Sequence, residues 1–260
     1  RLCILFFSHM KIQNRVFFYT IRSDGKLLEN IRYVYDGCDC KKVVFAKMLP
    51  HGFIDVFKVK YYMLTSKVIV TDDYLKYLRS VKLRKGQKVV QLWHASGAFK
   101  RFGLDAPSRL SRIEEFNTHS QYTDVCVSSE YVRQFYSHAF GVDMDIVKAI
   151  GSPRTDSLTD KEKLKSDKDY LCSMHPLLKD KKIYVYFPTF REVDGALTDF
   201  EPGIDWSKLN DELSDDEVFV ISRHPVMKKE FFKNTYDIVW LAEEEQFLPG
   251  TKIDVHAERL

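Results

Sequence analysis

A histidine at the end of an apolar run is the first group in this 260-residue sequence that could do chemistry. The segment from Val89 to Gly103 reads VVQLWHASGAFKRFG, so Trp93 and His94 follow a β-branched run and precede small residues. Such a run is typical of a buried parallel strand that ends at the sheet edge where α/β proteins bind ligands. Because imidazole titrates near neutral pH, His94 could take a proton from a hydroxyl, while Lys100 and Arg101 would favour an anionic ligand. A histidine that only anchors a turn is the alternative.

Three further polar clusters follow apolar runs in the same way. They read IVKAIGSPRTD from Ile146 to Asp156, IYVYFPTFRE from Ile183 to Glu192 and VFVISRHP from Val218 to Pro225. In open α/β sheets the carboxyl ends of the strands line one crevice, so clusters far apart in the sequence can serve one site.

The order and spacing of these motifs resemble a known family. Trp-His, Gly-Ser-Pro-Arg-Thr-Asp, Pro-Thr-Phe-Arg and His-Pro, taken in that order, resemble the CDP-glycerol glycerophosphotransferases, the teichoic-acid primases and polymerases that transfer a polyol phosphate. The resemblance spans roughly Lys67 to Pro225, and any one motif alone would be a weak signal. One departure is Ala-Ser-Gly-Ala-Phe after Trp-His, where many members have Gly-Thr-Pro-Leu.

The resemblance implies a reaction in which an acceptor hydroxyl attacks the β-phosphorus of CDP-glycerol or CDP-ribitol and CMP leaves. Phosphoryl transfer of this kind needs positioning, a base, and donors against the charge on the phosphate oxygens. It implies His94 as the base, with Trp93 packing to fix its ring. His224 would hydrogen-bond or protonate a phosphate oxygen at the leaving side, unless it only caps a strand end before Pro225.

Two arginines are candidate phosphate ligands, because the planar guanidinium group matches phosphate oxygens. Arg154 lies in the Gly-Ser-Pro-Arg turn, where an ion pair with Asp156 is the alternative, and Arg191 follows Pro-Thr-Phe. Backbone amides at that second turn could also receive a phosphate. The residues expected to bind phosphate or nucleotide are Ser152, Arg154, Thr189, Arg191 and Ser222. Those expected on the acceptor side are Trp93, Ser96, Lys100 and Arg101.

Several other kinds of site are excluded. The sequence has no dinucleotide fingerprint, Walker loop or Gly-x-Ser-x-Gly elbow. The other histidines lack partners at ligand spacing, so we expect no protein-bound metal, although a divalent ion could accompany the donor pyrophosphate. Five cysteines without a two-residue spacer predict reduced thiols and a cytoplasmic protein. The longest purely apolar run, Leu2 to Phe7, is far shorter than the ~20 residues of a membrane-spanning helix.

Charge is divided unevenly along the chain. Residues 1–156 carry 25 Lys and Arg against 15 Asp and Glu, whereas residues 158–260 carry 15 against 22. A basic first half suits a lipid-linked or polymeric polyol-phosphate acceptor, or the anionic inner face of the cell membrane, which predicts a peripheral location there. A solvated lysine-rich surface is the alternative. Basic and aromatic residues are not interleaved as in RNA-binding proteins, so we expect no nucleic-acid partner.

The elements that must position these residues follow from the alternation of apolar runs with amphipathic stretches, which predicts a parallel sheet covered on both faces. We expect helices at Asp73–Leu83 and Glu130–Phe140, the second capped by the Ser128-Ser129 hydroxyls and ended by Gly141. Strands are expected at residues 15–20, 42–45, 68–71, 88–92, 124–127 and 145–150.

After the Gly-Ser-Pro turn the pattern restarts with a helix from Asp160 to Leu171. Strands of this second part are expected near Ile183, Val218 and Ile238. We therefore expect two Rossmann-like domains, residues 1–156 with the acceptor side and the base, and residues 157–260 with the nucleotide. The resemblance implies that they face a cleft in the GT-B arrangement. The Thr-Asp-Tyr-Ser-Ser segment that follows His-Pro in the family is not found, so the second domain is expected to be incomplete.

Two other functions stay open. A sugar-nucleotide glycosyltransferase would use a similar cleft on the same fold to transfer a sugar. A non-catalytic module would bind anionic cell-wall polymer or its nucleotide precursor without turnover. CMP release from CDP-glycerol or CDP-ribitol in the presence of a lipid-linked primer distinguishes these functions.

Overall fold

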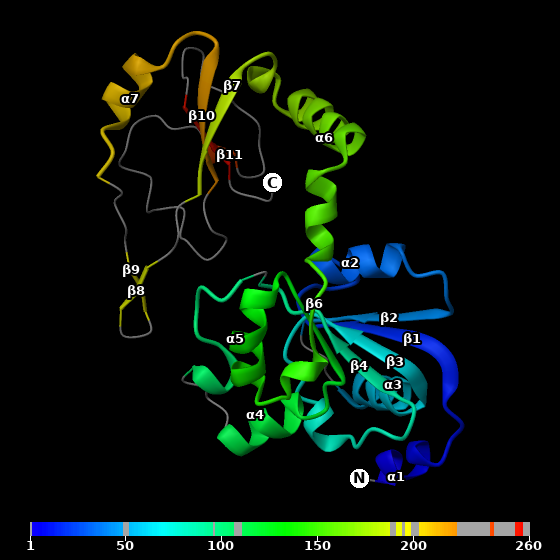
Figure 1. Cartoon of the computed structure of the whole chain (residues 1–260). Coiled ribbons are helices and arrows are strands. Elements are labelled where there is room, and N and C mark those ends of the chain that lie inside the picture. Colours follow the sequence, from blue (N-terminus) through cyan, green and yellow to red (C-terminus); the bar gives the residue numbers. More distant parts are fainter. Residues whose placement is uncertain are drawn as a thin grey trace. The chain divides into compact units, whose positions relative to one another are not determined.

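The chain folds into two compact units, residues 1–160 and 161–260, coloured blue to green and green to red in Figure 1. The computed structural model describes residues 2–48, 52–95, 97–106, 111–187, 191–193, 196–198, 203–222, 240–241 and 253–256. The division comes after Asp160 rather than at Asp156, because the 3-10 helix η4 (Pro153–Leu158) packs against α2 (Glu29–Asp36) of the first unit.

A six-stranded sheet forms the centre of the first unit, in the order β2-β1-β3-β4-β5-β6. Each strand pairs in parallel with its neighbour. All six predicted strands are present, and the last is shorter than predicted because Met144–Ile146 forms the 3-10 helix η3. The strands are β1 (Gln13–Thr20), β2 (Lys42–Ala46), β3 (Ser66–Thr71), β4 (Lys88–Gln91), β5 (Asp124–Val127) and β6 (Val147–Ala149).

Helices cover both faces of this sheet, as the alternating pattern predicts. Successive strand residues point to opposite faces, so Phe17 and Ile69 join one buried cluster while Phe18 and Val70 join another. Helix α2 supplies Ile31 to the second cluster. The first cluster is larger and receives side chains from α1 (Leu2–Ser8), α3 (Gly52–Thr65) and α5 (Glu130–Phe140). Helix α4 (Arg112–His119) and the 3-10 helix η2 (Gly103–Asp105) complete this unit.

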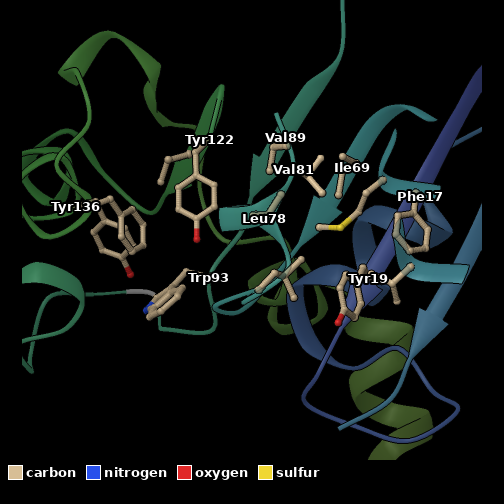
Figure 2. Close-up of a cluster of buried hydrophobic side chains, with 14 of the residues drawn as sticks. Phe17, Tyr19, Ile69, Leu78, Val81, Val89, Trp93, Tyr122 and Tyr136 are labelled. Carbon is tan, nitrogen blue, oxygen red and sulfur yellow. The ribbon is translucent and has the colours of Figure 1, made fainter. Parts of the chain in front are cut away.

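The larger cluster is rich in aromatic side chains. Figure 2 shows the rings of Trp93, Tyr122 and Tyr136 grouped at one end of it and those of Phe17 and Tyr19 at the other. All five are at most 7% exposed. Their burial removes a large apolar area from water, which stabilises the sheet edge that carries Trp93.

The helix expected at Asp73–Leu83 is wrong. The segment contains only the short 3-10 helix η1 (Leu78–Ser80). Leu75, Leu78 and Val81 are buried at intervals of three, which is the period of a 3-10 turn rather than of an α-helix. Tertiary packing therefore overrides the apolar spacing here.

The helix predicted at Glu130–Phe140 is confirmed as α5, and Gly141 ends it in the left-handed conformation with φ 62°. Ser129 takes the N-cap position, but its side chain makes no capping hydrogen bond, so the expected hydroxyl cap is wrong there. Burial of Val132, Tyr136 and Phe140 on one face holds the helix instead.

The second unit contains a four-stranded parallel sheet in the order β11-β12-β10-β7. Helix α6 (Lys161–Met174) confirms the predicted helix, and β7 (Lys182–Tyr186) and β10 (Glu217–Ser222) confirm two predicted strands. Ile238 lies outside the described residues. The remaining elements are the 3-10 helix η5 (Pro176–Leu178), β8 (Arg191–Val193), β9 (Ala196–Thr198), α7 (Trp206–Glu212), β11 (Trp240–Leu241) and β12 (Ile253–His256).

The expectation of five reduced cysteines is wrong at one place. Cys38 and Cys40 form a disulfide after the end of α2, with their Cα atoms 5.7 Å apart, within the range that a bridge requires. Cys126 and Cys172 are free, and burial raises the pKa of the Cys126 thiol to about 11. Over the described part of the chain, no helix has the length and apolar character to cross a bilayer.

Candidate functional site

The candidate site lies in the first unit, at the edge where the parallel strands end. Four loops bring polar side chains to this edge, because parallel strands share one carboxyl end. The loops follow β1, β3, β4 and β6 and contribute Arg22, Asp72, Asp73, Trp93, His94, Ser152 and Arg154.

His94 follows β4, and its side chain is 32% exposed. Its Nδ1 lies 3.3 Å from the Asp72 carbonyl oxygen and 3.5 Å from Oδ2 of Asp73. Both oxygens are acceptors, so we assign the ring proton to Nδ1, which leaves the lone pair on Nε2. Burial lowers the pKa of His94 and outweighs the opposing effect of the Asp73 charge, so the ring is neutral at pH 7. A neutral imidazole with its lone pair on Nε2 is the form that a general base requires.

The Trp93 side chain packs against the His94 ring. The two rings stack with centroids 4.5 Å apart, which confirms the predicted packing. The indole also contacts Phe102 and Phe140 and is only 7% exposed, so it holds the loop rather than offering a surface to an acceptor. Trp93 has φ 51°, a conformation that is uncommon for a bulky residue and that turns the chain sharply after β4.

Asn30, at the start of α2, connects two of the motifs. Its side-chain amide donates to the Trp93 carbonyl over 3.1 Å. Its Oδ1 accepts from the Ser152 hydroxyl at 2.9 Å and from the Arg154 backbone N–H at 3.1 Å. Asn30 is 2% exposed, so these bonds are shielded from water.

Ser152 was expected to bind phosphate or nucleotide, and the structure gives it a different task. A hydroxyl has one hydrogen to donate, and that of Ser152 goes to Asn30. The residue therefore fixes the turn that carries Arg154 instead of donating to a ligand.

A row of alternating charges joins Arg154 to His94. The Arg154 guanidinium lies 3.1 Å from Glu29, so its carboxylate partner is Glu29 rather than the Asp156 considered above. The Glu29 carboxylate is also 3.8 Å from the Arg22 guanidinium. That guanidinium lies 3.4 Å from Oδ2 of Asp73, the carboxylate beside His94. Each pair is partly exposed and contributes little alone, but together they place the two motifs in one charged network. Glu29 has φ 50°, a second strained position at this edge.

Asp72 is the most unusual carboxyl group of the site. It is 2% exposed, and burial raises its pKa to about 6. Its Oδ1 makes no hydrogen bond within the described residues. Sequence reasoning missed Asp72 and Asp73, although an acidic pair directly after a β-branched strand is the same signal that identified His94. Glu29 and Asn30 belong to no motif, and nothing in the sequence marks them.

The structure describes only some of the remaining candidate residues. Lys100 and Arg101 are exposed and lie between β4 and η2. Arg191 begins β8 with an exposed side chain, and Ser222 ends β10. Ser96, Thr189 and His224 lie outside the described residues. In the part of the chain that the structure describes, no three His, Cys, Asp or Glu side chains are grouped to hold a metal ion.

Comparison with known proteins decides the family. Residues 4–248 match the model of the family described as CDP-Glycerol:Poly(glycerophosphate) glycerophosphotransferase. The chain belongs to this glycerophosphotransferase family. The match confirms the family that the order of the motifs resembled.

Curated relatives of this family member include both polymerases and primases. The teichoic acid poly(ribitol-phosphate) polymerase of Bacillus spizizenii is 39% identical over 184 residues, which cover 68% of this chain and 29% of the relative. The teichoic acid ribitol-phosphate primase of the same species is 30% identical over 233 residues, which cover 83% of this chain and 60% of the relative. The chain thus spans less than two thirds of these relatives.

Solved structures agree on the fold of this family member. The wall teichoic acid polymerase TagF superimposes with a TM-score of 0.68 at 18% identity, covering 90% of this chain and 63% of that chain. A UDP-GlcNAc 2-epimerase from Neisseria meningitidis gives 0.53 at 9% identity, covering 95% and 73%. Because these two neighbours are named for different reactions, the fold does not by itself assign the chemistry.

Proposed function

We propose that this protein transfers glycerol phosphate or ribitol phosphate from a CDP-polyol donor to a hydroxyl of a teichoic-acid acceptor, lipid-linked or polymeric, and releases CMP. The observation that carries the proposal is the neutral His94, whose Nδ1 faces two oxygens so that the lone pair is on Nε2, at the sheet edge of a chain that belongs to the glycerophosphotransferase family. Both glycerol-phosphate and ribitol-phosphate enzymes are among its relatives, so both donors are proposed.

In the proposed reaction, Nε2 of His94 accepts the proton of the acceptor hydroxyl. The hydroxyl oxygen forms a bond to the β-phosphorus, and the bond from that phosphorus to the CMP oxygen breaks, with the electron pair leaving on CMP. The carboxylate of Asp73 and the carbonyl of Asp72 hold Nδ1–H and stabilise the imidazolium ion that forms. Asp73 is a positioning residue in this scheme.

The phosphate groups need positive charge and donors beside the base. In the first unit we assign phosphate binding to Arg154, because Asn30 fixes the turn that carries it to the His94 loop. Thr189, Arg191, Ser222 and His224 would supply the rest from residues 157–260, with His224 at the leaving oxygen. This assignment requires the two units to face a cleft in the GT-B manner.

The setting of the reaction is also proposed. The positive excess of residues 1–156 favours an acceptor carried at the anionic inner face of the cell membrane, where the protein would bind peripherally. No protein-held metal is required, and a divalent ion would arrive with the donor pyrophosphate.

The test is CMP release by the full-length protein with CDP-glycerol, CDP-ribitol and a lipid-linked primer. His94→Ala is expected to lower release by about 10²- to 10⁴-fold, because the base is removed, while binding of CDP-glycerol is kept. His9→Ala, an exposed histidine after α1, serves as the matched control and is expected to behave as the wild type. Normal turnover by His94→Ala would mean that the ring is structural, and binding of CDP-polyol without any CMP release would favour the non-catalytic module.

A further inference from the structure

A pocket of about 450 Å³ opens beside the His94 loop, between residues 98–105 and α5. Its volume falls in the range of about 300–1,000 Å³ that is typical of sites for small ligands. From the sequence, Lys100 and Arg101 are expected on the acceptor side, and the function proposed above gives no role to this pocket.

Two close contacts hold the segment that lines the pocket to α5. Tyr136 of α5 donates its hydroxyl to the Ala95 carbonyl over 2.6 Å, and burial raises its pKa to about 12, so the donor stays protonated. Gly103 approaches α5 so closely that a Cβ at this position would lie 2.2 Å from the Ala139 carbonyl oxygen. The segment that lines the pocket is therefore anchored to α5 near its two ends.

Aromatic side chains connect the pocket to His94. Phe102 lines the pocket, and the centroids of the Phe102 and Trp93 rings are 5.5 Å apart. Trp93 in turn stacks on His94. The pocket and His94 are thus connected through the Phe102 and Trp93 rings within the same unit.

Three kinds of group line the pocket, and together they indicate its ligand. Phe99 and Phe135 are 95% and 38% exposed, so large apolar surfaces face the solvent here. Lys100 and Arg101 are exposed cations that attract an anion. Asp105 accepts and His138 donates in a 2.6 Å pair, which offers polar contacts to hydroxyl groups. A ligand with a phosphate, hydroxyls and a carbon chain satisfies all three.

We propose that this pocket holds a polyol-phosphate unit of the acceptor, located behind the hydroxyl that faces His94. Lys100 and Arg101 contact the phosphodiester, the Phe99 and Phe135 rings cover the carbon chain, and the Asp105 pair contacts the hydroxyls. The inference rests on the proposed function, because it takes the acceptor to be a polyol-phosphate chain.

The experiment measures binding of a synthetic glycerol-phosphate hexamer to the full-length protein without donor. Lys100→Ala combined with Arg101→Ala is expected to weaken binding by about tenfold or more, since two charged contacts are lost. In turnover with the same oligomer, KM for the acceptor should rise similarly, with KM for CDP-glycerol unchanged. Lys165→Ala combined with Lys168→Ala on α6, which are exposed and outside the pocket, removes the same charge and should change neither value. A ribitol-phosphate hexamer tests the other polyol.

The outcomes separate the inference from the function. Unchanged hexamer affinity in the Lys100 and Arg101 variant, or equal binding of neutral triglycerol, overturns the pocket assignment. Loss of affinity for vesicles of phosphatidylglycerol with hexamer binding intact also overturns it, because the two cations then serve the membrane. If the wild type releases no CMP but its hexamer binding requires both cations, the transfer function fails and the pocket assignment stands.

Discussion

The chemistry of His94 depends on what surrounds its other nitrogen. Burial alone lowers the pKa of the ring, and a ring with a very low pKa is a weak base. The carboxylate of Asp73, 3.5 Å from Nδ1, acts in the opposite direction. Burial and the Asp73 charge together leave the ring neutral at pH 7 and still able to accept a proton.

Asp73→Asn is expected to lower kcat by about fivefold, because a partly exposed charge pair contributes on the order of 1 kcal/mol. The sign of the pH effect follows from the cause: the Asp73 charge raises the pKa of His94, so its loss lowers that pKa further. The acid limb of kcat/KM against pH should therefore move to lower pH. Asp36→Asn, an exposed carboxylate on α2, is the control. An unmoved acid limb in Asp73→Asn would contradict the positioning role.

The loops after the strands are held by close backbone packing as well as by side-chain bonds. Asn30 connects the loops after β4 and β6, and Gly103 fixes the segment after His94 against α5. Gly103 has φ 57°, and Gly86 has φ 87°, so both positions disfavour a side chain. Only Gly103 also has a backbone oxygen in the place of a Cβ, whereas nothing lies within 4 Å of a Cβ at Gly86.

This pair of glycines allows a matched test. Gly86→Ala is expected to destabilise the protein by about 1 kcal/mol through its positive φ, and Gly103→Ala by roughly 2 kcal/mol or more, because the clash with Ala139 adds to the same penalty. Urea unfolding of the two variants and the wild type measures the difference. Equal losses would show that the segment can move away from α5 without cost.

The stability of the whole first unit should depend on pH through a histidine outside the site. His119 is 1% exposed, its Nε2 makes no hydrogen bond within the described residues, and burial lowers its pKa from 6.5 to about 4. Between these values the unfolded chain binds a proton that the folded chain does not. The free energy of unfolding therefore rises with pH across this window and is constant above it.

His119→Phe removes this dependence. At each pH, the free energy of unfolding of the variant is compared with that of the wild type. Relative to the wild type, the variant is expected to be about 2 kcal/mol more stable at about pH 5 than at about pH 8, because only the wild type loses stability on acidification at this position. The constant cost of losing the contact with Tyr122 cancels in the comparison. Denaturant unfolding at the two pH values measures it, and a difference independent of pH would contradict the assigned cause.

Strand positions and the order of motifs follow from the sequence. Runs such as KVVQ and DVCV are β-branched and short, so β4 and β5 could be predicted from local preference. The place of His94 at the end of β4 followed from the same pattern, and the family followed from the resemblance carried by four motifs in their order. These features depend on neighbours in the chain, which a sequence displays directly.

Contacts between distant segments are what only the tertiary structure decided. The bond from Asn30 to Trp93 joins residues 63 positions apart, and that from Ser152 to Asn30 spans 122. The pairing of Arg154 with Glu29, and the turn in place of a helix after Asp73, likewise come from packing. Such pairs are selected by the shape of the folded sheet edge rather than by local preference, so no spacing along the chain displays them.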